Sequence, residues 1–197
     1  MEALLDYVVR IGSGNDQTLD AGSAVLFNFI FEWLHQHLDK EAEITCWLQN
    51  NLGIVEKSDP SHKDAIECMV RIANEMEGNE ELQGMLNSAL LNPTLEHYIL
   101  VVNGTFSDVT LSWGSVVALF YVACRFVVKA AEINSVDLVR SIINWTMPFI
   151  RKTCILTWIR EQGGWGAIRS YFGTPTWQTV GVFLAGVLTV GLVLYKM

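Results

Sequence analysis

Apolar residues recur along this chain mainly at the three- and four-residue intervals of an amphipathic α-helix, and almost nowhere at the two-residue interval of a strand. The pattern therefore predicts an all-α protein. The expected helices are Asp16–Leu38, Asp64–Asn79, Glu80–Leu91, Thr94–Val102, Leu111–Ala131, Val136–Lys152, Ile155–Ile159 and Trp165–Tyr171.

The most apolar of these helices, Leu111–Ala131, carries no charged residue before Arg125. A helix that is apolar on every side is buried. At 1.5 Å per residue it is about 30 Å long, so either other helices or a membrane must surround it. The break at Asn134-Ser135 is short, and Val136–Lys152 is therefore expected to pack beside it as an antiparallel partner.

Polar residues dominate 39–62, where Asn50-Asn51, Gly53 and the stretch Ser58-Asp59-Pro60-Ser61 favour turns. This segment is predicted to be a mobile linker within a helical domain of residues 1–173, because long loops of this kind are commonly mobile or functional. One short helical turn is expected near Ile44 to Leu48.

The run from Thr174 to Tyr195 has 22 residues and no charged side chain. That length spans a bilayer, and its Val, Leu and Phe residues supply roughly −3 to −6 kcal/mol toward insertion. Residues 174–197 are therefore predicted to be a C-terminal tail anchor. Its expected membrane-facing residues are Trp177, Val180, Phe183, Leu184, Leu188, Leu192 and Tyr195.

A protein groove competes with the membrane for the same tail. Each large apolar side chain that leaves water for a protein interior contributes about 1.5–3 kcal/mol. The tail therefore also suits burial as a C-terminal helix, and the sequence alone leaves both locations open.

The segment Asp64–Asn79 carries a narrow apolar stripe at positions i, i+4, i+7 and i+11, namely Ala65, Met69, Ile72 and Met76. A stripe of this kind allows a helix to lie in another protein's groove. A surface helix that packs on its own core needs the same pattern, so periodicity leaves the two interpretations open.

Charge divides the chain into unlike halves. The formal net charge is −8, made up of −12 over residues 1–100 and +4 over residues 101–197. The acidic total gives no electrostatic basis for binding nucleic acid, whereas the basic, apolar second half suits an anionic membrane surface. With 51% hydrophobic residues the chain has ample material for one folded domain.

The four cysteines lie far apart among apolar neighbours, as expected of reduced, buried thiols in an intracellular protein: Cys46, Cys68, Cys124 and Cys154. The first 20 residues carry four acids and lack the apolar run of a secretory signal. No phosphate loop, nucleophile elbow or metal-ligand spacing occurs, so the sequence predicts neither catalysis nor a cofactor or metal.

Two stretches resemble the homology motifs of the B-cell lymphoma 2 family of apoptosis regulators. Phe106-Ser107-Asp108, followed by Ser112-Trp113-Gly114 and the apolar residues 116–121, is similar to the first motif. Trp158-Ile159-Arg160-Glu161-Gln162-Gly163-Gly164-Trp165 is similar to the second. The run SYFGTPTWQTV at 170–180 and the tail after it are similar to the executioner members of that family, and the resemblance covers roughly Asp64 to Met197.

The resemblance implies a globular bundle of about nine helices around the central apolar helix, with a groove able to hold the tail. It places the third motif, a docking helix, on the apolar stripe, and it makes Ser112–Lys152 a membrane hairpin. The residues so implied are Ala65, Met69, Ile72, Ala73, Asn74 and Met76 in the docking helix; Asp108, Trp113, Gly114, Ser115 and Val116 in the groove and first motif; Trp158, Gly163, Gly164 and Trp165 in the second motif; and the basic residues Arg125, Lys129, Arg140, Arg151 and Lys152 in the hairpin.

The function implied is that of a regulator that is cytosolic at rest and inserts into the mitochondrial outer membrane when active. It would oligomerise with further copies, exchange helices with other family members through their grooves, and permeabilise the lipid membrane. A guardian of the same fold, which only sequesters partner helices and forms no pore, is the alternative.

Two positions depart from the family pattern. The family usually has Asp after the small residue of the third motif and Arg after the Trp-Gly of the first, and this chain has Asn74 and Ser115. Because losing both partners of an ion pair together can be nearly neutral, we expect Asn74 and Ser115 to hydrogen-bond in its place. Binding of partner helices with an Asp is expected to weaken, because that Asp would meet Ser115 instead of a cation.

Overall fold

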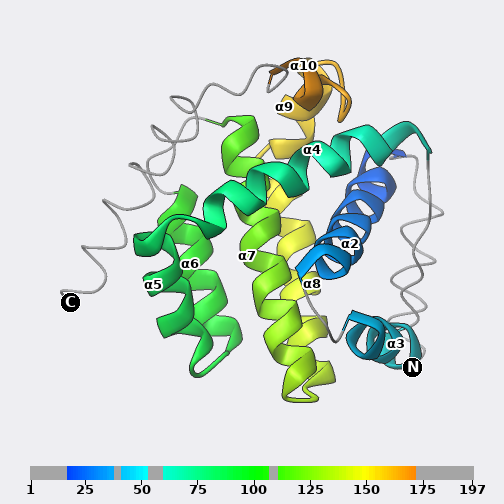
Figure 1. Cartoon of the computed structure of the whole chain (residues 1–197). Coiled ribbons are helices and arrows are strands. Elements are labelled where there is room, and N and C mark those ends of the chain that lie inside the picture. Colours follow the sequence, from blue (N-terminus) through cyan, green and yellow to red (C-terminus); the bar gives the residue numbers. More distant parts are fainter. Residues whose placement is uncertain (1–16, 38–40, 53–59, 107–110, 172–197) are drawn as a thin grey trace.

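In the computed structural model the described residues are 17–37, 41–52, 60–106 and 111–171, and their regular secondary structure is entirely helical. The predicted all-α fold is confirmed over these ranges. In the labels of Figure 1 the helices are α2 (Gln17–His37), α3 (Glu41–Leu52), α4 (Pro60–Glu77), α5 (Glu80–Leu90), α6 (Leu95–Phe106), α7 (Trp113–Glu132), α8 (Val136–Lys152), α9 (Ile155–Glu161) and α10 (Ala167–Tyr171).

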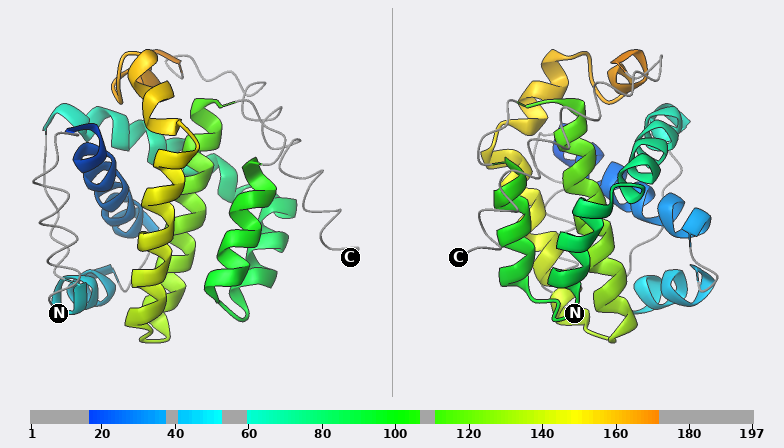
Figure 2. Two further views of the ribbon diagram at one scale, coloured as in Figure 1. Left: turned by 180° about the vertical axis from the view of Figure 1, so that it is seen from behind. Right: turned by 60° about the vertical axis from the view of Figure 1, so that its left-hand side comes forward.

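Helix α7 is the centre of the bundle, as its apolar sequence predicts. Sixteen of its twenty residues are buried, and it contacts α2, α3, α4, α5, α6 and α8. Figures 1 and 2 show α8 running along one face of α7 while α4 crosses the opposite face, with α5 and α6 on one side and α2 on the other. The surrounding helices therefore replace the water or lipid that α7 would otherwise meet.

The turn between α7 and α8 forms the antiparallel hairpin that the short break at Asn134-Ser135 predicts. Asn134 has φ of 55°, a left-handed conformation that asparagine tolerates at the end of a helix. The N–H of Ser135 donates to the carbonyl of Ala130 at 2.8 Å, which satisfies one of the last carbonyls of α7.

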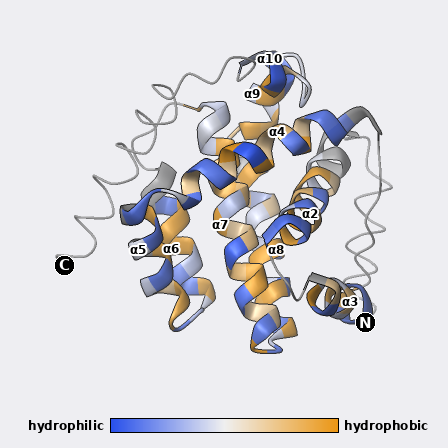
Figure 3. Ribbon diagram, in the orientation of Figure 1, coloured by the Kyte–Doolittle hydropathy of each residue, from blue (hydrophilic) through white to orange (hydrophobic). Residues whose placement is uncertain are grey.

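The outer helices are amphipathic. Figure 3 shows hydrophilic and hydrophobic stretches alternating along α2 and α4, as expected of helices with one face on the core and one in water. Within the described part of the chain, α7 is the single helix whose length and apolar composition would allow it to cross a membrane, and most of it is buried in the protein. The predicted tail anchor, 174–197, lies outside the described residues.

The prediction of a linker at 39–62 is wrong for much of that segment. Residues 41–52 form the twelve-residue helix α3 in place of a single turn. Its apolar residues Ile44, Leu48 and Leu52 recur every four residues and are buried. Helix α4 then begins at Pro60, four residues earlier than predicted, because proline is favoured in the first turn of a helix.

Smaller differences concern helix ends and thiols. Helix α6 continues to Phe106, beyond the predicted Val102, and α10 begins only at Ala167. Two of the four free cysteines are buried, but Cys46 and Cys154 are exposed, contrary to the prediction from their apolar neighbours. Cys154 stands at the junction of α8 and α9 with φ of 60°, which places it outside both helices and in contact with water.

A buried hydrogen bond ties α6 to α8. The Tyr98 and Thr146 hydroxyl oxygens are 2.6 Å apart, and both side chains are fully buried. Since Thr146 donates to the carbonyl of Ile142 at 2.6 Å, Tyr98 is the donor to Thr146 and must keep its proton. Burial raises the pKa of Tyr98 above its ordinary value of 10.

We expect the free energy of unfolding to fall as the pH rises above 10, the ordinary pKa of a tyrosine, because the unfolded chain then releases the Tyr98 proton while the folded chain retains it. The variant Tyr98→Phe should lose about 0.5–1.5 kcal/mol at neutral pH and show a smaller fall at alkaline pH. Urea unfolding followed by circular dichroism measures both quantities. An identical alkaline fall in the two proteins would contradict the role of Tyr98.

Candidate functional site

The apolar stripe of α4 faces the protein's own core. Ala65, Met69, Ile72 and Met76 are all at most 2% exposed, and the small residue Ala73 is fully buried beside them. Helix α4 packs against α2, α7 and α10. In this conformation the stripe packs on the core of its own protein, which is the second of the two interpretations that the sequence left open. The stripe residues would become available to a partner only if α4 left the bundle.

Burial of this stripe helps to hold α4 to the bundle. At about 1.5–3 kcal/mol for each large side chain, Met69, Ile72 and Met76 together hold α4 to the bundle by several kcal/mol. Methionine is flexible and fits grooves of different shapes. The same side chains therefore suit both the closed bundle and a different groove.

The expected hydrogen bond between Asn74 and Ser115 is wrong. Asn74 is exposed on the outer face of α4 and donates to Gln36 of α2 at 3.4 Å. Ser115 is fully buried and its hydroxyl donates to the carbonyl of Ser112 at 2.8 Å. The two side chains thus satisfy their hydrogen bonds separately.

Ser115 serves instead as part of the N-terminal cap of α7. The backbone N–H of Ser115 donates to the Ser112 hydroxyl at 3.2 Å, and the backbone N–H of Ser112 donates to the Ser115 hydroxyl at 3.0 Å. This reciprocal pair is a capping box, which satisfies two N–H groups that a helix start leaves without partners. The spacing of Ser112 and Ser115 in the sequence carries this signal, although the box usually has Glu or Gln at its second position.

Residues of the first and second motifs meet in an aromatic cluster. The ring of Trp113 lies 5.1 Å from that of Trp158 and 6.3 Å from that of Trp165, measured between centroids. Trp165 also lies 5.8 Å from Phe120. Trp113 and Trp165 are buried, so the two motifs hold α9 against the start of α7. Val116 is buried in the same helix, Gly114 is half-buried, and Asp108 lies outside the described residues.

The two glycines of the second motif make this cluster geometrically possible. Gly163 and Gly164 have φ of 101° and 85°, values that side chains with a Cβ rarely adopt. The N–H of Gly164 donates to the carbonyl of Ile159 at 2.9 Å and closes the end of α9. The chain then reverses, which brings Trp165 back onto Trp113.

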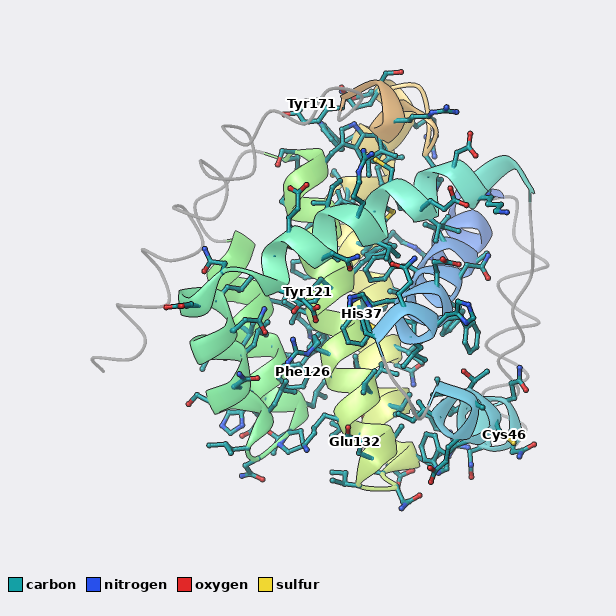
Figure 4. All side chains as sticks on the ribbon, in the orientation of Figure 1. His37, Cys46, Tyr121, Phe126, Glu132 and Tyr171 are labelled. Carbon is teal, nitrogen blue, oxygen red and sulfur yellow. The ribbon has the colours of Figure 1, made fainter. Side chains whose placement is uncertain are left out.

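The sequence missed a polar cluster where α4 ends. Its members, called here the Glu77 network, are Glu77 of α4, His37 of α2, Gln83 of α5, and Tyr121 and Arg125 of α7. One carboxylate oxygen of Glu77 is 3.2 Å from Nε2 of His37, and the other is 3.7 Å from Nη1 of Arg125. Figure 4 shows His37 and Tyr121 close together beneath α4.

Arg125 connects the remaining members of the Glu77 network. It donates to the hydroxyl of Tyr121 at 2.7 Å and to the side-chain oxygen of Gln83 at 2.8 Å. Gln83 donates to Tyr121 at 2.9 Å and to the backbone carbonyl of Met76 at 3.2 Å. A signal was present in the sequence: Arg125 is the first charge on an otherwise apolar helix, and a charge there needs a partner.

The predicted basic residues of the α7–α8 hairpin do not gather into one lipid-facing set in this conformation. Arg125 belongs to the Glu77 network, and Lys129 is 3.0 Å from Glu132. Arg140 is 3.7 Å from Asp137 and donates to the backbone carbonyl of Asn51 at 3.5 Å. Arg151 is exposed, and the side chain of Lys152 is not among those described.

Comparison with known proteins decides the family. A family model described as apoptosis regulator proteins of the Bcl-2 family matches residues 69–165. Apoptosis regulator BAX of Mus musculus is 38% identical to this chain over 191 residues, which is 95% of each protein. The chain belongs to the Bcl-2 family of apoptosis regulators. Human BAX is 46% identical over 138 residues, 70% of this chain and 71% of that protein.

Solved structures agree with the Bcl-2 fold. The crystal structure of chicken BOK has a TM-score of 0.54 at 20% identity and covers 81% of this chain and 98% of its own. The structure of Trichoplax adhaerens trBcl-2L2 bound to trBak BH3 has a TM-score of 0.52 at 21% identity, covering 76% and 99%. As a Bcl-2 family regulator similar to BAX, the chain is not an enzyme.

We expect Gly164→Ala to lower the free energy of unfolding by about 1–2 kcal/mol, because alanine is strained in the left-handed conformation. Gly166→Ala is the matched control, since a Cβ there meets no atom within 4 Å and the backbone is not left-handed. Urea unfolding of the two variants measures the difference. Equal stability would contradict the requirement for glycine in the second motif.

We expect Arg125→Gln to destabilise the protein by about 1.5–3 kcal/mol, because hydrogen bonds of a charged donor are lost where they are shielded from water. The exposed Arg151→Gln provides the control and should change stability little. Thermal unfolding followed by circular dichroism compares them. The assignment of the Glu77 network would fail if both variants unfolded at the same temperature.

Proposed function

We propose that this chain is a pro-apoptotic regulator that is cytosolic at rest and, when activated, inserts into the mitochondrial outer membrane, oligomerises and permeabilises it. Helix α7 carries the proposal. It is apolar and long enough for a bilayer, yet it is enclosed by the bundle. The similarity to BAX along 95% of the chain supports the same function.

Oligomerisation would proceed by exchange of the docking helix. The buried face of α4 carries the apolar residues that a groove requires, and the related fold of trBcl-2L2 was solved with a BH3 segment bound. A second copy of this chain, or another family member, would receive α4 in the same manner. For α4 to be released, the Glu77 network must break together with the contacts that Met69, Ile72 and Met76 make with the core.

Membrane attachment would rest on the tail anchor 174–197 and on the α7–α8 hairpin. The tail has the length and composition to span the mitochondrial outer membrane. The hairpin would follow once the surrounding helices open, because its apolar residues need either protein or lipid around them.

The guardian of the same fold is less well supported. A groove that captures partner helices with an Asp needs a cation at the position of Ser115. Here Ser115 is neutral, fully buried and committed to the cap of α7. This weighs against tight sequestration of charged partner helices and in favour of the pore-forming function.

We expect the purified full-length protein to release dye from liposomes of mitochondrial lipid composition when a peptide of residues 60–77 is added. Removal of 174–197 should abolish the release, because the tail supplies the membrane anchor. Liposomes of neutral lipid serve as the control for charge dependence, and fluorescence dequenching measures release. Tight peptide binding without release would indicate the guardian instead.

A further inference from the structure

The outer side of α8 combines apolar and basic residues at the surface of the closed bundle. Its inner side packs against α7 and, more lightly, against α2, α3, α6 and α9. The left view of Figure 2 shows α8 at the front of the bundle, with its outer side facing the viewer. The surface called here the α8 face consists of the exposed residues Asn144, Pro148 and Arg151 and the half-buried residues Leu138, Trp145 and Phe149.

Two aromatic rings on the α8 face hold each other in place. The rings of Trp145 and Phe149 are stacked, with centroids 4.8 Å apart and planes at 18°. The buried ring of Tyr98 meets Trp145 edge-on at 5.5 Å. Tryptophan prefers the boundary between lipid headgroups and acyl chains, because its ring is apolar and its N–H is polar. The stacked pair therefore presents a fixed, partly exposed apolar surface that suits this boundary.

The charge around the α8 face has one sign. Residues 138–160 contain no Asp or Glu, whereas the whole chain has a formal net charge of −8. The basic residues in that stretch are Arg140, Arg151, Lys152 and Arg160. Arg140 contacts Asn51 of α3, so Arg151 is the exposed cation that the face itself contributes. An anionic lipid surface attracts each nearby basic residue by about 1 kcal/mol. The charge therefore favours an approach with this side toward the lipid.

We propose that the α8 face docks the closed bundle on an anionic lipid surface. Trp145 and Phe149 lie at the level of the headgroups, and the guanidinium of Arg151 pairs with lipid phosphate. All helices keep their packing in this docked state, and α4 stays in the bundle. The attachment is peripheral and reversible, because it uses a surface and not a spanning segment. It does not depend on pore formation, so it goes beyond the proposed function.

Reversal of one charge tests the docking. Full-length protein is floated with liposomes of mitochondrial lipid composition or of neutral lipid, without added peptide. Wild type should bind the anionic liposomes and be released by high salt, which screens the attraction. Arg151→Glu should lower the association constant at least about fivefold. Lys63→Glu is the matched control, since it makes the same charge change on α4 at a side chain that is 73% exposed; its association constant should stay within about twofold of wild type.

An added aromatic residue tests the apolar part of the contact. Asn144→Trp places a second indole on the α8 face at an exposed position, and it should strengthen binding at least about threefold. Ser88→Trp, on an exposed position of α5, makes a comparable addition elsewhere and should leave binding unchanged. Thermal unfolding followed by circular dichroism verifies that each of the four variants remains folded. Equal strengthening by the two tryptophans would contradict docking through α8.

The remaining outcomes separate this surface from the proposed function. Equal loss of binding in Arg151→Glu and Lys63→Glu would mean that net charge alone governs attachment, which overturns the α8 face. Binding that resists high salt and is unchanged in Arg151→Glu would indicate insertion of another segment and also overturns it, as does a wild type that does not bind. If wild type docks as expected but never releases dye, even with the peptide of residues 60–77, the proposed pore function fails while the α8 face stands.

Discussion

The whole structure depends on keeping α7 out of water. Most of its side chains are buried, and each large one contributes about 1.5–3 kcal/mol by leaving water. The helices that contact α7 are amphipathic because they shield it on one side and meet water on the other. By length and apolar composition, α7 could also cross a bilayer. The contacts of the surrounding helices hold it in the bundle instead.

Elements with strong periodicity could be predicted from the sequence. The uncharged stretch before Arg125 identified the central helix, and Asn134-Ser135 marked the turn of the hairpin. The stripe of α4 was also recognisable, but periodicity could not tell whether it faced a partner or the core. Only the burial of Met69 and Met76 distinguishes these alternatives, because burial depends on residues distant in the sequence.

The features that could not be predicted from the sequence depend on contacts that form only in the folded protein. Helix α3 has only twelve residues, too few to be stable alone in water, so it owes its stability to the docking of Ile44, Leu48 and Leu52 on the bundle. The Glu77 network joins residues up to 88 positions apart, from His37 to Arg125. In the sequence these charged side chains look like ordinary solvated residues, but in the fold they are ion-pair partners of one another. The family resemblance assigned Ser115 to the groove, whereas in the structure its side chain belongs to the N-terminal cap of α7.

The unequal exposure of the four thiols makes the resting molecule chemically asymmetric. Cys46 on α3 and Cys154 beside α9 face solvent, whereas Cys68 and Cys124 are buried in α4 and α7. A water-soluble alkylating reagent meets two sulfur atoms while the bundle is closed. Departure of α4 uncovers a third, and separation of the helices around α7 uncovers the fourth. The order in which the cysteines become alkylated thus records the order in which the helices come apart.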